Sequence, residues 1–100
     1  MEIDIKEING VIAAELKGSL DSQSAAACKE ALQPLFDKAD GKLLIDCKEL
    51  EFISSSGLRL FLALYKETVS KGGEISFENV NSEIKCIFEL TGFAKSFNIK

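Results

Sequence analysis

The stretch LLIDCKELEFISSSGLRLFLALYK, residues 43–66, decides the fold. Its first residues, LLIDC, are apolar without alternation, which predicts a short strand ending near Cys47 and covered on both faces. KELEFI then leads to three serines and a glycine, and we expect the apolar segments on both sides of these serines to join the core. From near Ser56, apolar residues recur at intervals of three and four, which is typical of a helix face: Leu58, Phe61, Leu62, Tyr65 and Val69.

The residues before this stretch predict an antiparallel hairpin. EIDIKEI, residues 2–8, alternates apolar and polar side chains, as a half-buried strand does. The pair Asn9-Gly10 favours a tight turn, because both residues tolerate a positive φ. VIAAELK, residues 11–17, then forms the returning strand.

The segment between the hairpin and the central strand predicts an interrupted helix. Its apolar residues recur at helical spacing over residues 25–39, and Gly41 ends it. Pro34 lacks a backbone N–H and clashes with the preceding turn, so we expect a kink or a break into two shorter helices. Three residues are candidates to cap the start: Asp21, Ser22 and Ser24.

The last quarter of the chain predicts one more strand and one more helix. EISFENV, residues 74–80, follows a Gly-Gly pair that ends the preceding helix. NSEIKCIFELTG, residues 81–92, has helical spacing, with Asn81 or Ser82 as the cap and a stop at Gly92. We expect the tail, residues 93–100, to add one helical turn and an extended end.

These elements predict a single small α/β domain over residues 1–100, in the order β-β-α-β-α-β-α. The first two strands pair antiparallel, whereas the later strands need crossover helices and therefore run parallel. The expected fold is thus a small mixed β-sheet, an N-terminal antiparallel hairpin plus parallel strands, with helices packed against it.

The composition excludes several classes of function. The formal net charge is −4 with no basic run, which argues against nucleic acids and anionic membranes as partners. The chain has no histidine, which excludes Ser-His-Asp and Cys-His nucleophiles, and we expect neither an enzyme nor a cofactor. No apolar run approaches the roughly 20 residues of a membrane span, and no signal sequence is visible. Three cysteines without a CxxC pair predict free thiols on apolar faces, in a reducing cytoplasm.

The three serines, Ser54 to Ser56, allow two interpretations. One serine suffices to cap a helix, and the others are then small polar loop residues. Alternatively, one hydroxyl is a phosphorylation site at a helix N-terminus, where unpaired N–H groups and a positive dipole end favour negative charge. A nucleophile-elbow serine does not fit, because the glycine pattern is wrong and no histidine is available. Gly57 lets another group come close to this helix.

Two aspartates allow a structural and a functional interpretation in the same way. Asp21 is expected mainly as a helix cap, and Asp46 as a strand-end turn or cap residue or as part of a site. Two carboxylates near serines loosely suggest magnesium, but their spacing is unspecific, and we expect no metal.

Four stretches of the chain matter together: LKGSLDSQSA, LLIDCKELEFISSSGLRLFLALYK, KGGEIS and NSEIKCIFELTGFAKSFNI. In combination they give a resemblance to the STAS-domain family of bacterial anti-sigma factor antagonists. The first resembles the family's Gly-x-Leu-Asp segment, and the second resembles its central strand, phosphorylation loop and following helix. KGGEIS resembles the glycine-bounded entry to the next strand. NSEIKCIFELTGFAKSFNI resembles the late helix and its Leu-Thr-Gly-Phe corner. The four occur in the family's order over most of the chain.

The resemblance implies a partner-switching regulator of transcription with a STAS-like fold. The unphosphorylated antagonist binds an anti-sigma factor with serine kinase activity, phosphorylation on serine releases it, and a PP2C-type phosphatase reverses the modification. The family's acceptor lies two positions before the motif glycine, which is Ser55 here, and Asp21 matches the acidic residue near the acceptor. The resemblance places the partner-binding surface on six residues: Asp21, Ser54, Ser55, Ser56, Gly57 and Arg59.

The motif departs from the best-known antagonists at two positions. Ser54 stands where an aspartate is common, and Arg59 stands where a small residue is common. Ser54 and Ser56 therefore remain alternative acceptors. A STAS-type scaffold that binds its partner constitutively, without phosphorylation, is the alternative function. We expect a monomer.

Overall fold

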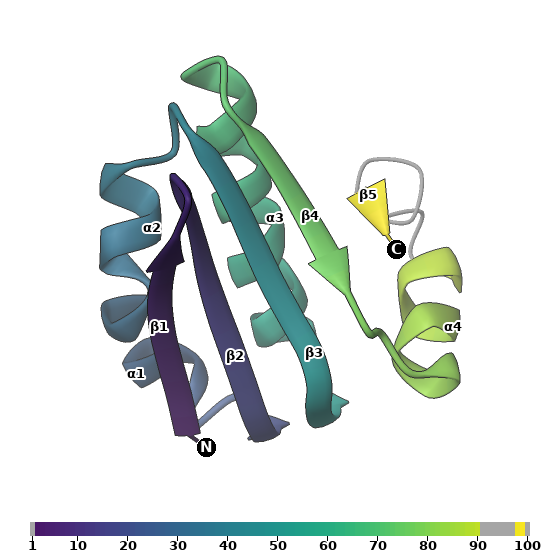
Figure 1. The fold of residues 1–100 in the computed structure, drawn as a ribbon. Helices are drawn as coiled ribbons and strands as arrows, with labels where there is room; N and C mark the ends of the chain where they lie inside the picture. Colours follow the sequence, from purple (N-terminus) through teal and green to yellow (C-terminus); the bar gives the residue numbers. More distant parts are fainter. Residues whose placement is uncertain (1, 91–97, 100) are drawn as a thin grey trace.

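A five-stranded sheet in the order β1-β2-β3-β4-β5 forms the centre of the computed structural model, which describes residues 2–90, 98 and 99 (Figure 1). The strands are β1 (Glu2–Ile8), β2 (Val11–Leu20), β3 (Lys42–Ile53), β4 (Glu74–Glu78) and β5 (Asn98–Ile99). The helices are α1 (Ala25–Ala31), α2 (Gln33–Asp37), α3 (Ser55–Ser70) and α4 (Ser82–Leu90). β1 and β2 are antiparallel and all other neighbours are parallel, which confirms the predicted mixed sheet.

The N-terminal hairpin has the predicted tight turn. Asn9 and Gly10 adopt φ values of 51° and 81°, as the sequence pair favours. The register pairs Ile3 with Leu16 and Ile5 with Ala14, so these side chains lie on the same face of the sheet. This is the face that the helices cover.

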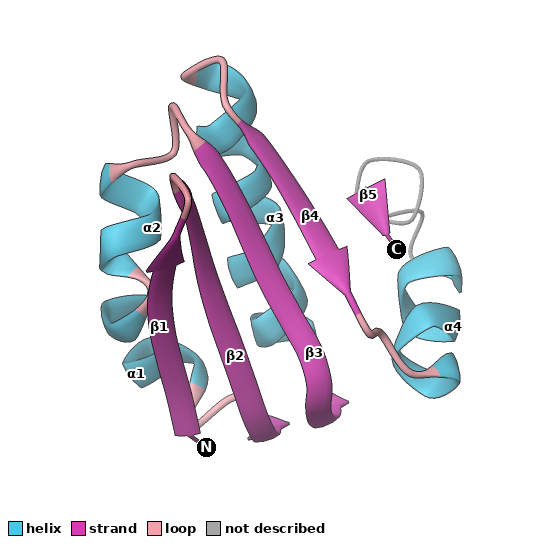
Figure 2. Cartoon of the chain, in the orientation of Figure 1, coloured by secondary structure: helices cyan, strands magenta, loops and turns pink. Residues whose placement is uncertain are grey.

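The predicted helix before β3 is broken into α1 and α2, as Pro34 led us to expect (Figure 2). Leu32 lies between the two helices, with φ −86° and ψ 2°, and Pro34 lies in the first turn of α2. Early in a helix, a missing N–H costs nothing, because that N–H would have no partner inside the helix. α2 ends at Asp37, earlier than the predicted end at Gly41.

β3 differs from the prediction in length and in coverage. It continues past Cys47 to Ile53, because register shifts against β2 let the pairing resume at Lys17 and Glu49. The expected coverage of both faces is also wrong. Leu43 and Ile45 are buried, whereas Leu44 is only half-buried, since α1, α2 and α3 all lie on one face of the sheet (Figure 1).

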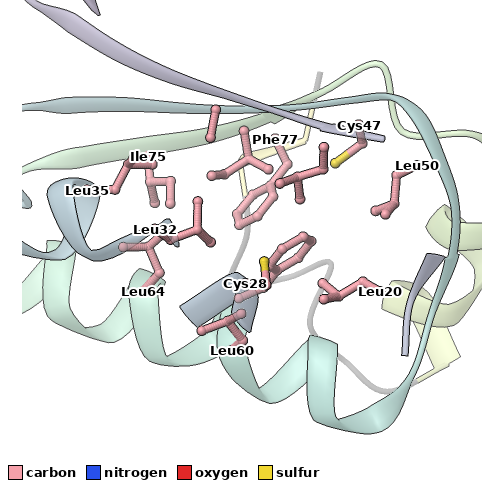
Figure 3. Close-up of a cluster of buried hydrophobic side chains, with 14 of the residues drawn as sticks. Leu20, Cys28, Leu32, Leu35, Cys47, Leu50, Leu60, Leu64, Ile75 and Phe77 are labelled. Atoms are coloured by element: carbon pink, nitrogen blue, oxygen red, sulfur yellow. The ribbon is translucent and has the colours of Figure 1, made fainter. Parts of the chain in front are cut away.

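The core fills the space between the sheet and these helices. Figure 3 shows leucines of α2 and α3, Cys28 and Cys47 among the side chains pointing into it. The aromatic rings of Phe61, Phe77 and Phe88 close the core where α3, β4 and α4 meet, with centroid distances of 5.1 to 6.3 Å. Tilted and edge-on ring pairs stabilise the folded state by more than the burial of their apolar area alone.

Two expectations about individual core residues are wrong. The helical spacing predicts Val69 on the apolar face of α3, but its side chain is 57% exposed, and Thr68 is buried instead. The Thr68 hydroxyl donates to the Leu64 carbonyl at 2.7 Å, which satisfies it inside the helix. Cys86 is exposed on α4 rather than packed on an apolar face, whereas Cys28 and Cys47 are buried free thiols as expected.

The ends of α3 and α4 follow the predicted signals. α3 ends at a Schellman-type turn, in which Gly72 has φ 78° and the Gly73 N–H donates to the Thr68 carbonyl. Asn81 caps α4, accepting from the Ile84 N–H at 2.9 Å. The stop at Gly92 and the helical turn of the tail lie outside the described residues. The extended end is present as β5, which pairs with β4.

None of the helices described is long and apolar enough to cross a membrane.

Candidate functional site

The serine stretch lies where β2 and β3 end and α3 begins. The Ser54 N–H donates to the Leu20 carbonyl at 2.8 Å, which ties the last residue of β2 to the β3–α3 junction. Asp21 follows Leu20 directly, so the loop that carries Asp21 adjoins the serines, although they lie more than 30 positions apart in the sequence. Sites in parallel α/β sheets form at such carboxyl ends of strands.

Ser54 is the N-cap of α3. Its backbone is extended, with φ −88° and ψ 173°, and its Oγ accepts a hydrogen bond from the Gly57 N–H at 3.2 Å. The capping interpretation of the serines is therefore satisfied by Ser54 alone.

The other two serines have different surroundings. Ser55 is the first residue of α3, and its side chain is exposed and makes no hydrogen bond to the described residues. Ser56 is half-buried. Ser55 is thus the most exposed of the three serines, and its hydroxyl, unlike that of Ser54, makes no hydrogen bond in the described structure.

Gly57 is buried because two strand ends pack against it. A Cβ at this position would lie 2.7 Å from Leu20 Cγ and 2.8 Å from Ile53 Cγ1, closer than real Cβ atoms come. The close approach that the sequence indicated is therefore made by the side chains of Leu20 and Ile53. Gly57 is thus buried, and it contributes to the site by allowing Leu20 and Ile53 to pack against the first turn of α3.

Asp21 shapes the loop between β2 and α1. Its Oδ1 accepts from the Gln23 N–H at 3.0 Å and the Ser24 N–H at 2.9 Å, and it lies 3.0 Å from the Ser24 hydroxyl. Because these bonds favour the charged form, those from Ser24 above all, the pKa of Asp21 is lowered. Ser24 precedes α1 without a side-chain cap bond, so Asp21 is the acceptor that orders this turn.

Asp46 belongs to a different part of the molecule. Its Oδ1 accepts from Asn79 Nδ2 and from the Lys48 N–H, both at 3.0 Å, which fastens β3 to the turn after β4. The β3 residues between Asp46 and Ile53 span roughly 20 Å. Asp21 and Asp46 therefore share no site. Among the described residues, no group of three or more Asp, Glu, Cys or His side chains is arranged to hold a metal ion.

Two exposed side chains lie close to the serines in the sequence, one on each side. Phe52 precedes Ile53 on β3 and is 49% exposed, which contradicts the expectation that this apolar segment joins the core. Its cross-strand partner on β2 is the small Ser19. Arg59 is exposed on the second turn of α3. The sequence analysis did not identify Phe52 as an exposed residue. The signal for its exposure is the pairing of β3 with β2, which continues beyond Cys47.

The buried thiols offer no chemistry to this site. Burial raises the pKa of Cys28 to about 11 and that of Cys47 to about 12. Both sulfurs are therefore protonated and weakly nucleophilic at neutral pH.

A hollow of about 640 Å³ lies at the other end of the sheet from the serines, against Lys42, Val69 and Gly73. The surface at the serines thus carries small hydroxyl side chains, with the exposed Arg59 on the second turn of α3 and the Asp21 loop adjoining them.

The STAS domain family model matches residues 2–100, and the chain belongs to this family. The anti-sigma-B factor antagonist of Bacillus subtilis is 27% identical over 99 residues, which cover 99% of this chain and 90% of that protein.

Solved structures show the same fold. An anti-sigma factor antagonist from Mycobacterium paratuberculosis matches with a TM-score of 0.86 and 23% identity, over 98% of this chain and 83% of that one. The Bacillus cell fate determinant SpoIIAA in its phosphorylated form matches with a TM-score of 0.75 and 16% identity, over 99% and 91% of the two chains.

Proposed function

We propose that this chain is an anti-sigma factor antagonist, which binds an anti-sigma factor when Ser55 is unmodified and releases it when Ser55 carries a phosphate. The observation that carries the proposal is the exposed, uncommitted hydroxyl of Ser55 at the start of α3, in a chain of the STAS domain family. Near full-length similarity to an anti-sigma-B factor antagonist supports the same function. SpoIIAA, which shares the fold, has a phosphorylated form.

The three serines are not equivalent as acceptors. The Ser54 hydroxyl caps α3, so a phosphate there would disturb the first turn of the helix. Ser56 is half-buried, which restricts the access of a kinase. Ser55 is exposed and its side chain makes no bond within the described structure, so modification need not disturb the fold.

The unmodified surface suits protein binding. Its hydroxyls are small and neutral, so a partner can approach the backbone closely. Phe52, two residues before Ser54 in the sequence, adds a half-exposed aromatic ring to this end of β3, and aromatic side chains dominate the binding energy of many interfaces. Asp21, Ser54, Ser56 and Arg59 would contribute polar contacts at the rim, where they add more to specificity than to affinity.

A phosphate on Ser55 would oppose this contact electrostatically. It adds a charge of about −1.5 to −2 to a chain whose formal net charge is already −4. Burying such a group against a partner costs several kcal/mol unless the partner itself supplies charges that pair with it. A loss of about 3–4 kcal/mol lowers affinity several hundred-fold, so no refolding is required for the switch.

The enzymes that would act on Ser55 are an anti-sigma factor with serine kinase activity and a PP2C-type phosphatase. In the forward step, the γ-phosphoryl group of ATP forms a bond to Ser55 Oγ as its bond to ADP breaks, and the hydroxyl proton passes to a base on the kinase. In the reverse step, water replaces the serine oxygen on phosphorus and inorganic phosphate leaves. Both activities belong to the partners.

The test uses Ser55→Ala and Ser55→Asp proteins as baits in lysate of the native host. The alanine bait should retain the anti-sigma factor and the aspartate bait should lose it. Ser70→Asp is the matched control, because it adds the same charge at an exposed serine about 22 Å along α3, and it should retain the partner.

Two outcomes would change the proposal. Equal recovery by the alanine and aspartate baits would favour constitutive binding without a phosphate switch. Incubation of the unmodified protein with ATP and the captured kinase, followed by mass spectrometry, should place the phosphate on Ser55. A phosphate on Ser54 or Ser56 instead would move the acceptor.

A further inference from the structure

Arg59 is an exposed cation with no partner in the described structure. It makes no ion pair and no hydrogen bond with any described residue, in contrast to Lys17, whose Nζ lies 3.6 Å from both an Asp4 and a Glu49 oxygen. Arg59 belongs to the same uninterrupted helix as Ser55, four positions further along. Its charge is therefore available to a group at the start of α3.

Helix geometry brings these two residues together. Side chains at positions i and i+4 lie on one face, with Cβ atoms about 5–6 Å apart. An acidic group N-terminal to a basic one is the favourable order for such a pair. A guanidinium group also presents parallel N–H donors that match two oxygens of a phosphate.

We propose that Arg59 holds the phosphate of phospho-Ser55 in an ion pair within α3. This inference rests on the proposed function and adds a role for Arg59 as a positioning residue. The phosphate then acts twice. It adds negative charge at Ser55, and it withdraws the Arg59 guanidinium from the surface offered to the anti-sigma factor.

The other nearby charges make Arg59 the cation suited to this role. Within four positions of Ser55 in the sequence, the charged residues are Glu51 and Arg59. The Leu20 carbonyl accepts a hydrogen bond from the Ser54 N–H, and the charged residues within four positions of Leu20 are Lys17 and Asp21. Glu51 and Asp21 would repel a phosphate, and Lys17 is engaged by two carboxylates.

The pairing also discriminates between acceptors. At about 100° per residue, Ser55 and Arg59 are roughly 40° apart around the helix axis, whereas Ser54 precedes the helix and its Oγ accepts a hydrogen bond from the Gly57 N–H. A phosphate on Ser56, three positions before Arg59, would still come within reach. The ion pair thus favours modification at Ser55 or Ser56 over Ser54.

The test measures the phosphate directly. Phosphoserine is incorporated at position 55 by an expanded genetic code, and the ³¹P NMR shift is followed against pH. The second pKa of the phosphate should be about 0.2–0.4 units higher in Arg59→Gln than in the otherwise unchanged phosphoprotein. Arg59→Lys should restore part of the difference, and 1 M salt should remove most of it.

Lys66→Gln provides the matched control. It removes one exposed positive charge from the same helix, about 10 Å beyond Arg59, and should leave the phosphate pKa unchanged. Equal phosphate pKa values with Arg59 and with Gln at this position would overturn the inference. Because phosphoserine is incorporated directly, that result stands whether or not a kinase modifies the chain. Failure of the switch itself would appear in the Ser55 baits instead.

Discussion

Gly57 is the residue whose size matters most to the site. Two side chains at the strand ends, Leu20 and Ile53, occupy the space that a Cβ would need. The first turn of α3 can therefore approach the ends of β2 and β3 closely, which places Ser54 within hydrogen-bond distance of Leu20.

Gly57→Ala should destabilise the domain by about 1–3 kcal/mol, because the added methyl group overpacks this contact. Gly41→Ala is the control, since its Cβ would meet only the Lys38 carbonyl oxygen at 3.6 Å, an ordinary contact. Urea unfolding compares the two variants with the parent chain. Equal stabilities of the two alanine variants would contradict the packing described around Gly57.

Asp21 makes part of the stability depend on pH. Its folded pKa is lowered, so its contribution is present above the ordinary pKa near 3.8 and is lost as pH falls through the folded value. Asp21→Asn should therefore be less stable than the parent chain at pH 7, and this difference should shrink below about pH 4.

The matched control for this change is Asp40→Asn, which removes a carboxylate that accepts no hydrogen bond within the described residues. Urea unfolding at pH 7 and pH 3 provides the measurement. A difference between Asp21→Asn and the parent chain that stays constant over this range would show that the Asp21 charge does not stabilise the turn.

At the scale of elements, α3 depends on its cap. Ser54→Ala removes the acceptor for the Gly57 N–H and should cost about 1 kcal/mol of unfolding free energy. Ser55→Ala removes a hydroxyl with no bond in the described structure and should change stability by less than about 0.5 kcal/mol. Chemical denaturation of both variants tests this division of roles. A larger cost for Ser55→Ala would mean that Ser55 has a structural role.

The sequence predicts some elements better than others, for physical reasons. The Asn9-Gly10 turn and the break at Pro34 follow from backbone restrictions that act locally, and both are found. The length of β3 and the outward position of Phe52 depend on pairing with β2, which residue patterns within β3 do not reveal. Leu44 explains why coverage of both faces of β3 was a wrong prediction. It is an apolar residue on the open face of the sheet, so the alternation of apolar and polar residues that marks a half-buried strand is absent.

The candidate site was predictable only in part. Serine is a preferred N-cap, and Gly57 indicates a close approach of another group. The sequence does not distinguish the three adjacent serines, whereas the structure shows that Ser54 is the N-cap of α3. The expected acceptor Ser55 came from resemblance to the STAS family. The pairing of Ser55 with Arg59 depends on the helix beginning at Ser55.

At the scale of the whole molecule, burial separates the three thiols. Cys86 is exposed, whereas Cys28 and Cys47 are buried with pKa values raised to about 11 and 12. At pH 8, a thiol reagent should therefore modify Cys86 quickly and the other two only when the chain unfolds. Rapid modification of all three in the native protein would contradict the described core.

The central claim is that a phosphate on Ser55 strongly weakens binding to the anti-sigma factor without changing the fold. Once the partner is captured, isothermal titration calorimetry of the unmodified and Ser55-phosphorylated proteins tests this claim most directly, with circular dichroism to compare their folds. We predict an affinity several hundred-fold lower for the phosphorylated form, which corresponds to about 3–4 kcal/mol, and unchanged spectra. Equal affinities of the two forms would contradict the account.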